Sequence, residues 1–128
     1  MKTITHPPIG ILITMGKEVL EANGGGAEWQ KHFESCVRSE DSGFWLHKSR
    51  NAPKEDIAVV YVIAENFLKY KVFYGGYERG PTSVWMRTGE ERKINWPRMI
   101  LAGPFEKCPH DIPMRGFQGF RYVYEPMF

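Results

Sequence analysis

The sequence lacks the features that mark membrane, disulfide-stapled or strongly basic proteins. It has two cysteines, Cys36 and Cys108, and 17 Lys and Arg against 15 Asp and Glu leave a formal charge of +2. No apolar run approaches the roughly 20 residues that span a bilayer, and the early run at residues 9–15 is much shorter. We therefore expect a cytoplasmic protein with reduced thiols and no membrane partner.

Familiar catalytic motifs are also missing. The glycines at residues 24–26 are followed by Ala27-Glu28, where a phosphate-binding loop requires Lys and then Ser or Thr. There is no Gly-x-Ser-x-Gly nucleophile elbow, and the carboxylates are scattered over expected turns and helix faces. The sequence therefore does not point to a phosphate-loop enzyme or a serine hydrolase, and we expect no cofactor.

Aromatic residues, by contrast, are abundant. Four Trp, six Tyr and eight Phe make up 14% of the 128 residues. The length indicates a single domain over residues 1–128, and one small core does not readily hold so many rings. We therefore expect some of them to line a groove or an interface.

The hydrophobic pattern predicts one substantial helix near the N-terminus. After a brief helical turn at residues 17–22 and a glycine break at 23–26, helical spacing begins at residue 27. The apolar face of this helix consists of Trp29, Phe33, Cys36 and Val37. Residues 39–43 are expected to end it.

Short apolar runs predict the strands of a small sheet. They are expected at residues 10–15, 44–47, 57–64, 67–74, 83–87, 99–102 and 120–124. One face of the strand at 67–74 should consist of Leu68, Tyr70, Val72 and Tyr74. Turns or loops are expected at Gly75-Gly76, residues 88–93, Gly103-Pro104 and residues 108–113. The pattern predicts an α+β fold, with a small bent sheet or open β-barrel beside the N-terminal helix.

The stretch at residues 112–122 combines two glycines, three rings and two arginines. Glycine lets the backbone approach a flat partner, rings stack on nucleobases, and arginine binds phosphate. We predict nucleic-acid contacts by Arg115, Phe117 and Arg121. The alternative is that Phe117 and Phe120 fill the core of a bulged strand.

A second cluster follows the strand expected at residues 44–47. Here Trp45 would stack on a base, while His47 and Ser49 would read its polar edges. The candidate nucleic-acid-binding residues of this cluster and its basic rim are Trp45, His47, Ser49, Arg50, Lys69 and Lys71. The alternative is a core Trp45 with a surface loop behind it.

A metal site is a further alternative. His32 and Cys36 are spaced i, i+4 on the predicted helix, and Cys108 and His110 flank Pro109, which gives a Cys2His2 set for zinc. Because Cys-x-His is not a usual zinc-knuckle spacing, we favour a buried Cys36 and a solvated His32, with no metal.

Several segments resemble the PUA-like superfamily, with its ASCH and EVE branches nearest, over roughly residues 43 to 128. They are Phe44-Trp45-Leu46-His47, the loop with Pro53 and Asp56, Val60-Tyr61-Val62-Ile63 and Gly119-Phe120-Arg121-Tyr122. The resemblance implies a small β-barrel with a cleft for RNA or a modified base. In ASCH proteins a Gly-Lys-Lys-Thr-like stretch helps to form that cleft. Here the corresponding place reads Met15-Gly16-Lys17-Glu18-Val19, which departs from the pattern at Glu18.

Three hypotheses about function follow. The leading one is a non-catalytic module that binds RNA, DNA or a modified nucleobase in an aromatic-walled cleft. The second is a small nucleoside or RNA hydrolase of the ASCH type, in which Lys17 acts with Glu18 or Glu65. The third is a protein-interaction factor of phage or mobile-element origin that uses an exposed aromatic patch.

Overall fold

The computed structural model describes residues 6–38, 43–86 and 88–128. The predicted helix end at residues 39–42 and the predicted strand end at Arg87 lie outside these ranges. The elements in chain order are β1 (Gly10–Thr14), α1 (Lys17–Ala22), α2 (Gly26–Cys36), β2 (Phe44–Lys48), β3 (Val59–Ala64), β4 (Phe67–Glu78), β5 (Thr82–Trp85), β6 (Glu91–Ile94), β7 (Arg98–Pro113) and β8 (Phe120–Val123). No helix in the described part of the chain has the length and apolar character needed to cross a membrane.

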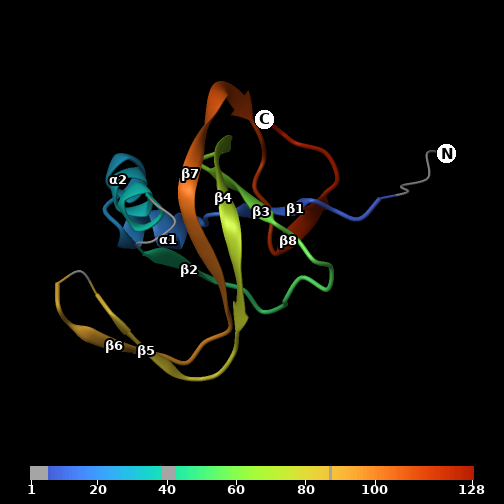
Figure 1. Ribbon diagram of the computed structural model, residues 1–128. Helices are drawn as coiled ribbons and strands as arrows, with labels where there is room; N and C mark the ends of the chain where they lie inside the picture. The colour runs from blue at the N-terminus through green and yellow to red at the C-terminus, as the bar shows by residue number, and fades with distance from the viewer. Residues whose placement is uncertain (1–5, 39–42, 87) are drawn as a thin grey trace.

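Six strands form one curled, half-barrel sheet in the order β2-β7-β4-β3-β1-β8, with the helices on one side (Figure 1). β1 and β3 pair in parallel, and the other neighbours described in this sheet pair antiparallel. β5 and β6 form a separate two-stranded hairpin. The predicted α+β fold with a bent sheet is therefore confirmed. The brief helical turn predicted at residues 17–22 is α1, with six residues, and the helix predicted from residue 27 is α2, with eleven. The prediction of one substantial helix is not confirmed, because the structure has two short ones in its described part.

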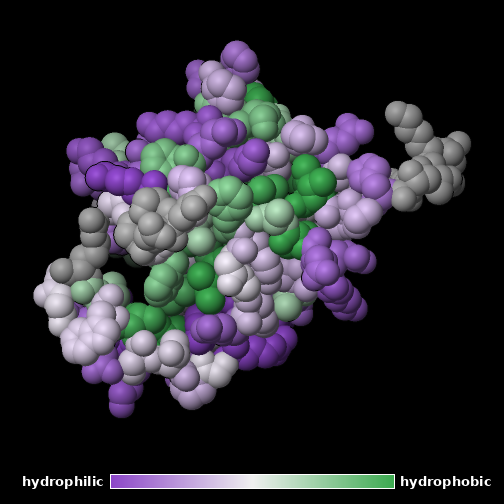
Figure 2. Space-filling model, viewed as in Figure 1, coloured by the Kyte–Doolittle hydropathy of each residue, from purple (hydrophilic) through white to green (hydrophobic). Residues whose placement is uncertain are grey.

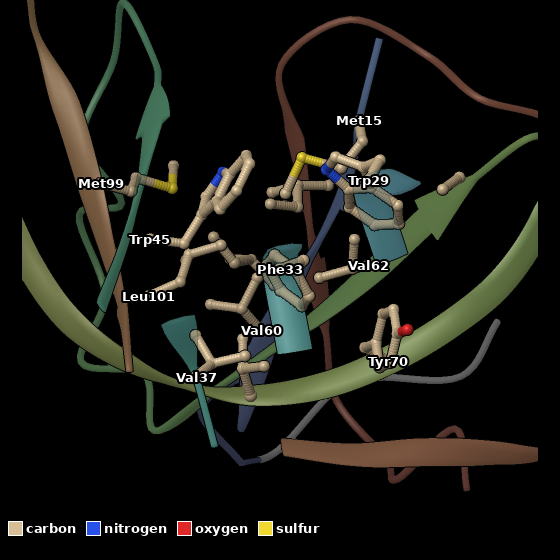
Figure 3. Packing of buried hydrophobic residues seen from close by; sticks show 14 of the residues in the cluster. Met15, Trp29, Phe33, Val37, Trp45, Val60, Val62, Tyr70, Met99 and Leu101 are labelled. Atoms are coloured by element: carbon tan, nitrogen blue, oxygen red, sulfur yellow. The ribbon is translucent and has the colours of Figure 1, made fainter. Parts of the chain in front are cut away.

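The helices cover one face of the sheet, which we call the helix-covered face. Trp29 and Phe33 of α2 are fully buried there, and their rings stack with centroids 5.2 Å apart. Figure 3 shows these two rings among side chains of β2, β3, β4 and β7. Trp29 and Phe33 are four residues apart and therefore lie on the same side of α2. Burial of both rings thus fixes which side of the helix faces the sheet.

The opposite face, which we call the C-terminal face, carries a second hydrophobic cluster. Its buried members are Leu12, Tyr61, Ile63 and Leu68. Residues from the end of the chain cover them, including Phe117 and Phe128, and the Met127 N–H donates to the Tyr61 hydroxyl at 3.2 Å. β3 is therefore buried on both faces, which explains its unbroken apolar sequence.

A bulge at Lys69 corrects the predicted face of β4. Leu68 pairs with Ile63, while Tyr70 pairs with Val62, so Lys69 is an extra residue between two regular pairs. Directly opposed residues share a face of a sheet. Leu68 therefore joins the second cluster on the C-terminal face, whereas Tyr70 joins the core under the helices.

The predicted breaks at Gly75-Gly76 and Gly103-Pro104 lie inside strands. Gly76 adopts φ +120°, a conformation open to glycine, and β4 continues beyond it to Glu78. In β7, Glu106 pairs with Lys71 and Ala102 with Phe73, so residues 103–105 stand opposite Val72 alone. Pro104 has no backbone N–H, and it lies in a bulge where no hydrogen bond between β4 and β7 requires one.

The segments at residues 108–113 and 88–93, which were predicted as a loop and a turn, also contain strand residues. Residues 108–111 stand opposite Lys69 as a second, wider bulge, and β7 resumes pairing at Ile112 and Pro113. Residues 91–94 form β6, although their charged sequence was typical of a turn. β6 pairs with β5 in a two-stranded sheet in which Ile94 is buried, Val84 is half-buried and the other residues are exposed, so the strand forms without apolar alternation.

Candidate nucleic-acid interface

The carboxyl ends of the parallel strands β1 and β3 bring together segments that are far apart in the sequence. Thr14 ends β1 opposite Ile63 of β3, and the Met15 N–H donates to the Ile63 carbonyl at 2.8 Å. α1 starts directly after β1, and the turn at Glu65 follows β3. Lys17 and Glu65, two predicted functional residues, therefore lie near the same end of the sheet.

The loop at residues 114–119 joins this end of the sheet through Thr14. The Phe117 N–H donates to Thr14 Oγ1 at 3.1 Å, and the Met114 N–H donates to the Asn66 carbonyl at 2.9 Å. Gly116 lies so close that an added Cβ would come within 2.7 Å of Thr14 Cγ2. The absence of a side chain at Gly116 is thus what lets the loop close onto β1.

Phe117 and Arg121 form a stacked pair beside this loop. The Arg121 guanidinium lies 4.1 Å from the centroid of the Phe117 ring. Phe117 is half-buried against the second cluster, whereas Arg121 and Arg115 are exposed. Phe117 is therefore partly a core residue and partly a surface residue. Its backbone N–H and its packing on the second cluster hold the loop in place, while its ring contacts the Arg121 guanidinium.

Lys17 and Glu65 have partners other than each other. Lys17 is 88% exposed, and its Nζ lies 3.8 Å from Glu21 in the next turn of α1. Glu65 adopts φ +54°, and its carboxylate lies against Gly26 in the first turn of α2, where the helix dipole favours a negative charge. Glu18 is exposed in the first turn of α1.

Trp45 is a core residue, which corrects the prediction that it stacks on a base. Its side chain is 9% exposed, and its ring packs against those of Phe33 and Trp29 at centroid distances of 5.4 and 6.4 Å (Figure 3). The His32 ring lies 5.5 Å away. The alternative of a core Trp45 is therefore the one that the structure supports.

The neighbours of Trp45 are engaged in the fold. His47 is half-buried opposite Met99, and burial lowers its pKa to about 4, so its ring is neutral at pH 7. The Ser49 hydroxyl donates to the Asn51 carbonyl at 2.8 Å. The Arg50 side chain is exposed, while its carbonyl accepts a hydrogen bond of 2.9 Å from the Tyr77 hydroxyl.

Trp45 and Arg121 do not share a cleft. Trp45 lies on β2, at one edge of the sheet, and contributes to the core on the helix-covered face. Arg121 lies on β8, at the other edge, and is paired with Leu12, whose side chain is on the C-terminal face. The structure therefore does not bring Trp45 and Arg121, two predicted binding residues, together in one cleft.

The predicted basic rim is divided as well. Lys69 occupies the β4 bulge, with its Nζ 5.4 Å from the centroid of the Phe67 ring. Lys71 pairs with Tyr61 on the C-terminal face and stands opposite Glu106 of β7. A cation across from a carboxylate in neighbouring strands is a common surface arrangement and by itself indicates no ligand.

The four residues of the predicted zinc set are not assembled. His32 packs its ring on Trp45, and Cys36 packs against the core. Cys108 packs against the second cluster, and its thiol donates to the His110 carbonyl at 3.2 Å. Within residues 6–38, 43–86 and 88–128, no three or more His, Cys, Asp or Glu side chains are grouped to hold a metal ion. His32 and Cys36 are both half-buried, between the solvated His32 and the buried Cys36 that the sequence favoured.

A polar pocket that the sequence did not reveal lies between α2 and the paired bulges of β4 and β7. Its volume is about 150 Å³, and it is lined by Gln30, Phe67, Leu68, Lys69, Tyr70, Lys107, Cys108, His110 and Asp111. The Tyr70 hydroxyl donates to Glu34, whose carboxylate lies 3.3 Å from Lys107 Nζ. Burial and the Glu34 charge raise the pKa of Tyr70. The pocket is small beside the ~300–1,000 Å³ of typical ligand sites, and its central groups already satisfy one another.

The chain matches no family model, no curated protein and no solved structure.

Proposed function

We propose that the protein is a non-catalytic module of the PUA-like type that binds RNA, DNA or a modified nucleobase at the carboxyl ends of β1 and β3. We call this surface the strand-end site and define it as Lys17, Arg115, Phe117 and Arg121. The observation that carries the proposal is the stacking of Arg121 on Phe117 beside a loop held against Thr14.

The Phe117–Arg121 pair supports nucleic-acid binding through its geometry. A guanidinium that lies over a ring presents a flat, charged surface on which an unstacked base can stack. Phe117 is anchored in the second cluster, so little conformational entropy is lost when a ligand binds. The exposed side chains of Arg115 and Lys17 supply cations for the phosphates on either side.

The exposure of Lys17 favours binding over hydrolysis. A lysine becomes a base or nucleophile at neutral pH when burial or a neighbouring cation disfavours its charge. Lys17 is 88% exposed, and its Nζ lies 3.8 Å from the carboxylate of Glu21, so it is neither buried nor beside another cation in that pair. In the strand-end site it is therefore suited to hold a phosphate.

A titration with fluorescent single-stranded RNA and DNA at about 50 and about 200 mM salt tests this proposal. We expect binding that weakens with salt, and we expect the Arg115→Ser/Arg121→Ser double variant to bind about tenfold more weakly. Arg38→Ser removes an exposed arginine beyond the end of α2 and serves as the matched control. Absence of binding at low salt, or equal binding by the double variant, would overturn the proposal.

A further inference from the structure

The β5–β6 hairpin, which we call the arm, stands apart from the six-stranded sheet. Figure 1 shows it below the sheet and beside β2, and in Figure 2 the same region forms a lobe that projects from the body of the molecule. Trp85 on β5 is 74% exposed, more than Phe44, Phe67 or Phe73. Packing of the described residues does not account for a tryptophan in this position.

The base of the arm is held by a buried arginine. Arg98 is 1% exposed and starts β7, directly after the arm. Its Nη1 donates to the carbonyls of Gly80 and Trp96 at 2.9 and 3.0 Å, and its Nη2 donates to Glu78 at 2.7 Å. Gly80 precedes the arm and Trp96 follows it, so Arg98 ties together the two ends of the hairpin. The arm is therefore fixed at its root while Trp85 remains in solvent.

The strand register places polar side chains on the same face as Trp85. Trp85 pairs with Glu91, and Ser83 pairs with Lys93 two residues along. Side chains two residues apart on a strand point to one side, so Lys93 and Trp85 are diagonal neighbours. The face therefore presents the Trp85 ring between the Glu91 carboxylate directly opposite and the Lys93 ammonium on the diagonal. An apolar protein surface would find no apolar neighbours for the ring there, whereas a base stacked on the ring could direct its phosphate toward Lys93.

A groove continues from this face to the root of the arm. It has a volume of about 440 Å³ and is lined by Pro81, Thr82, Ser83, Lys93, Ile94 and Asn95. The volume lies within the ~300–1,000 Å³ range of ligand sites. The lining combines the apolar surface of Pro81 and Ile94 with the hydroxyl, ammonium and amide groups of Thr82, Ser83, Lys93 and Asn95.

Cations extend the groove beyond the arm. Arg79 is exposed two residues before Pro81, and its guanidinium lies 5.5 Å from the centroid of the Tyr77 ring. Its Nη2 donates to the Arg50 carbonyl at 3.3 Å, which places the exposed Arg50 beside it. A phosphate backbone leaving the groove would therefore meet these two arginines.

We propose that the arm is a second contact for single-stranded nucleic acid, in which Trp85 stacks on a base while Lys93 and Arg79 hold the neighbouring phosphates. This inference rests on the proposed function, and it adds the class of ligand and a separate element that binds it. The twelve residues of β4 lie between the turn at Glu65 and the root of the arm. This is roughly 40 Å of extended chain, so the strand-end site and the arm contact different nucleotides.

Fluorescence titration with short single-stranded DNA and RNA oligonucleotides tests the proposal. A base stacked on Trp85 quenches its emission, whereas Trp29 and Trp45 are buried and respond little. The half-buried Trp96 at the root of the arm is still present in Trp85→Ala, so the difference between wild type and variant isolates the signal of Trp85. We expect quenching in the wild-type protein, its loss in Trp85→Ala together with about tenfold weaker binding, and recovery of most of the affinity in Trp85→Phe. Phe73→Ala, which removes an exposed ring from the main sheet, should leave the affinity unchanged.

The variants also separate the two sites. If Arg115→Ser/Arg121→Ser retains the quenching of Trp85 by short oligonucleotides, the arm binds nucleic acid whatever the strand-end site does. If Trp85→Ala binds every oligonucleotide as the wild type does, the arm proposal is wrong while the strand-end site stands. Preference for duplex over single strands, or a purified protein partner that needs Trp85 when no oligonucleotide quenches it, would also overturn the arm proposal.

Discussion

Arg98 and Glu78 form an ion pair of 2.7 Å in which one side chain is buried and the other is not: Arg98 is 1% exposed and Glu78 is 50% exposed. Removal of Glu78 and removal of Arg98 should therefore affect the stability of the fold unequally. A buried guanidinium without its carboxylate keeps a charge away from water, whereas Glu78 without Arg98 is already hydrated.

This difference predicts which of two variants is less stable. Glu78→Ala should lower the free energy of unfolding by about 3 kcal/mol, because it leaves the buried Arg98 cation with carbonyl partners alone. Arg98→Met should cost less, about 1 kcal/mol, because a similar volume is kept and no charge is buried. Urea unfolding of both variants at pH 7 measures the difference, and the opposite order would contradict this account of the arm's root.

His47 predicts a loss of stability in mild acid. Burial lowers its pKa from 6.5 to about 4 in the folded protein, so between these values the unfolded chain binds a proton that the folded chain does not. This contribution to stability is full above about pH 6.5 and decreases as the pH falls toward 4, by roughly 3 kcal/mol. His47→Gln should show a smaller decrease in urea unfolding between pH 7 and pH 4.5. Parallel curves for the two proteins would refute the role of His47.

Trp45 should matter for stability and not for binding. Trp45→Ala removes a buried ring that contacts Trp29 and Phe33, and we expect a cost of about 3 to 5 kcal/mol. Trp45→Phe keeps most of the packing and should cost less. At a temperature where Trp45→Phe is fully folded, its affinity for single-stranded RNA should equal that of the wild type. A selective loss of affinity in this folded variant would restore Trp45 as a binding residue.

Gly116 and Thr14 should behave as a coupled pair. Gly116→Ala places a Cβ within 2.7 Å of Thr14 Cγ2, which we expect to cost about 1 to 3 kcal/mol and to weaken binding at the strand-end site. Thr14→Ser removes that methyl group while it keeps the Oγ acceptor for the Phe117 N–H. The double variant should therefore recover stability in a double-mutant cycle. Gly80→Ala, at a glycine with open space around it, is the control, and additive effects at residues 14 and 116 would contradict the close contact.

The sequence predicted the elements whose side chains follow a simple period. Trp29 and Phe33 marked the buried face of α2, and the unbroken apolar run marked β3. It could not predict the faces of β4, because one extra residue at Lys69 turns Leu68 to the other side of the sheet. It also missed β6, because the three exposed, charged residues before the buried Ile94 carry no apolar alternation.

The candidate site was likewise predictable only where its residues are close in the sequence. Arg115, Phe117 and Arg121 are close in sequence, and the structure keeps Phe117 and Arg121 in contact. Trp45 was attached to the same cleft on its chemistry alone, and the position of β2 at the far edge of the sheet is a property of the topology. Trp85 has no neighbouring motif in the sequence, and its exposure follows from the position of the arm apart from the core.

The most direct test of nucleic-acid binding at the carboxyl ends of β1 and β3 is a map of backbone amide chemical shifts during titration with single-stranded RNA. We predict that the largest changes occur at residues 14–18 and 114–121, with a second group in the arm around Trp85. Changes confined to the surface around Phe44 and Phe73, or no changes at low salt, would contradict binding at the strand-end site.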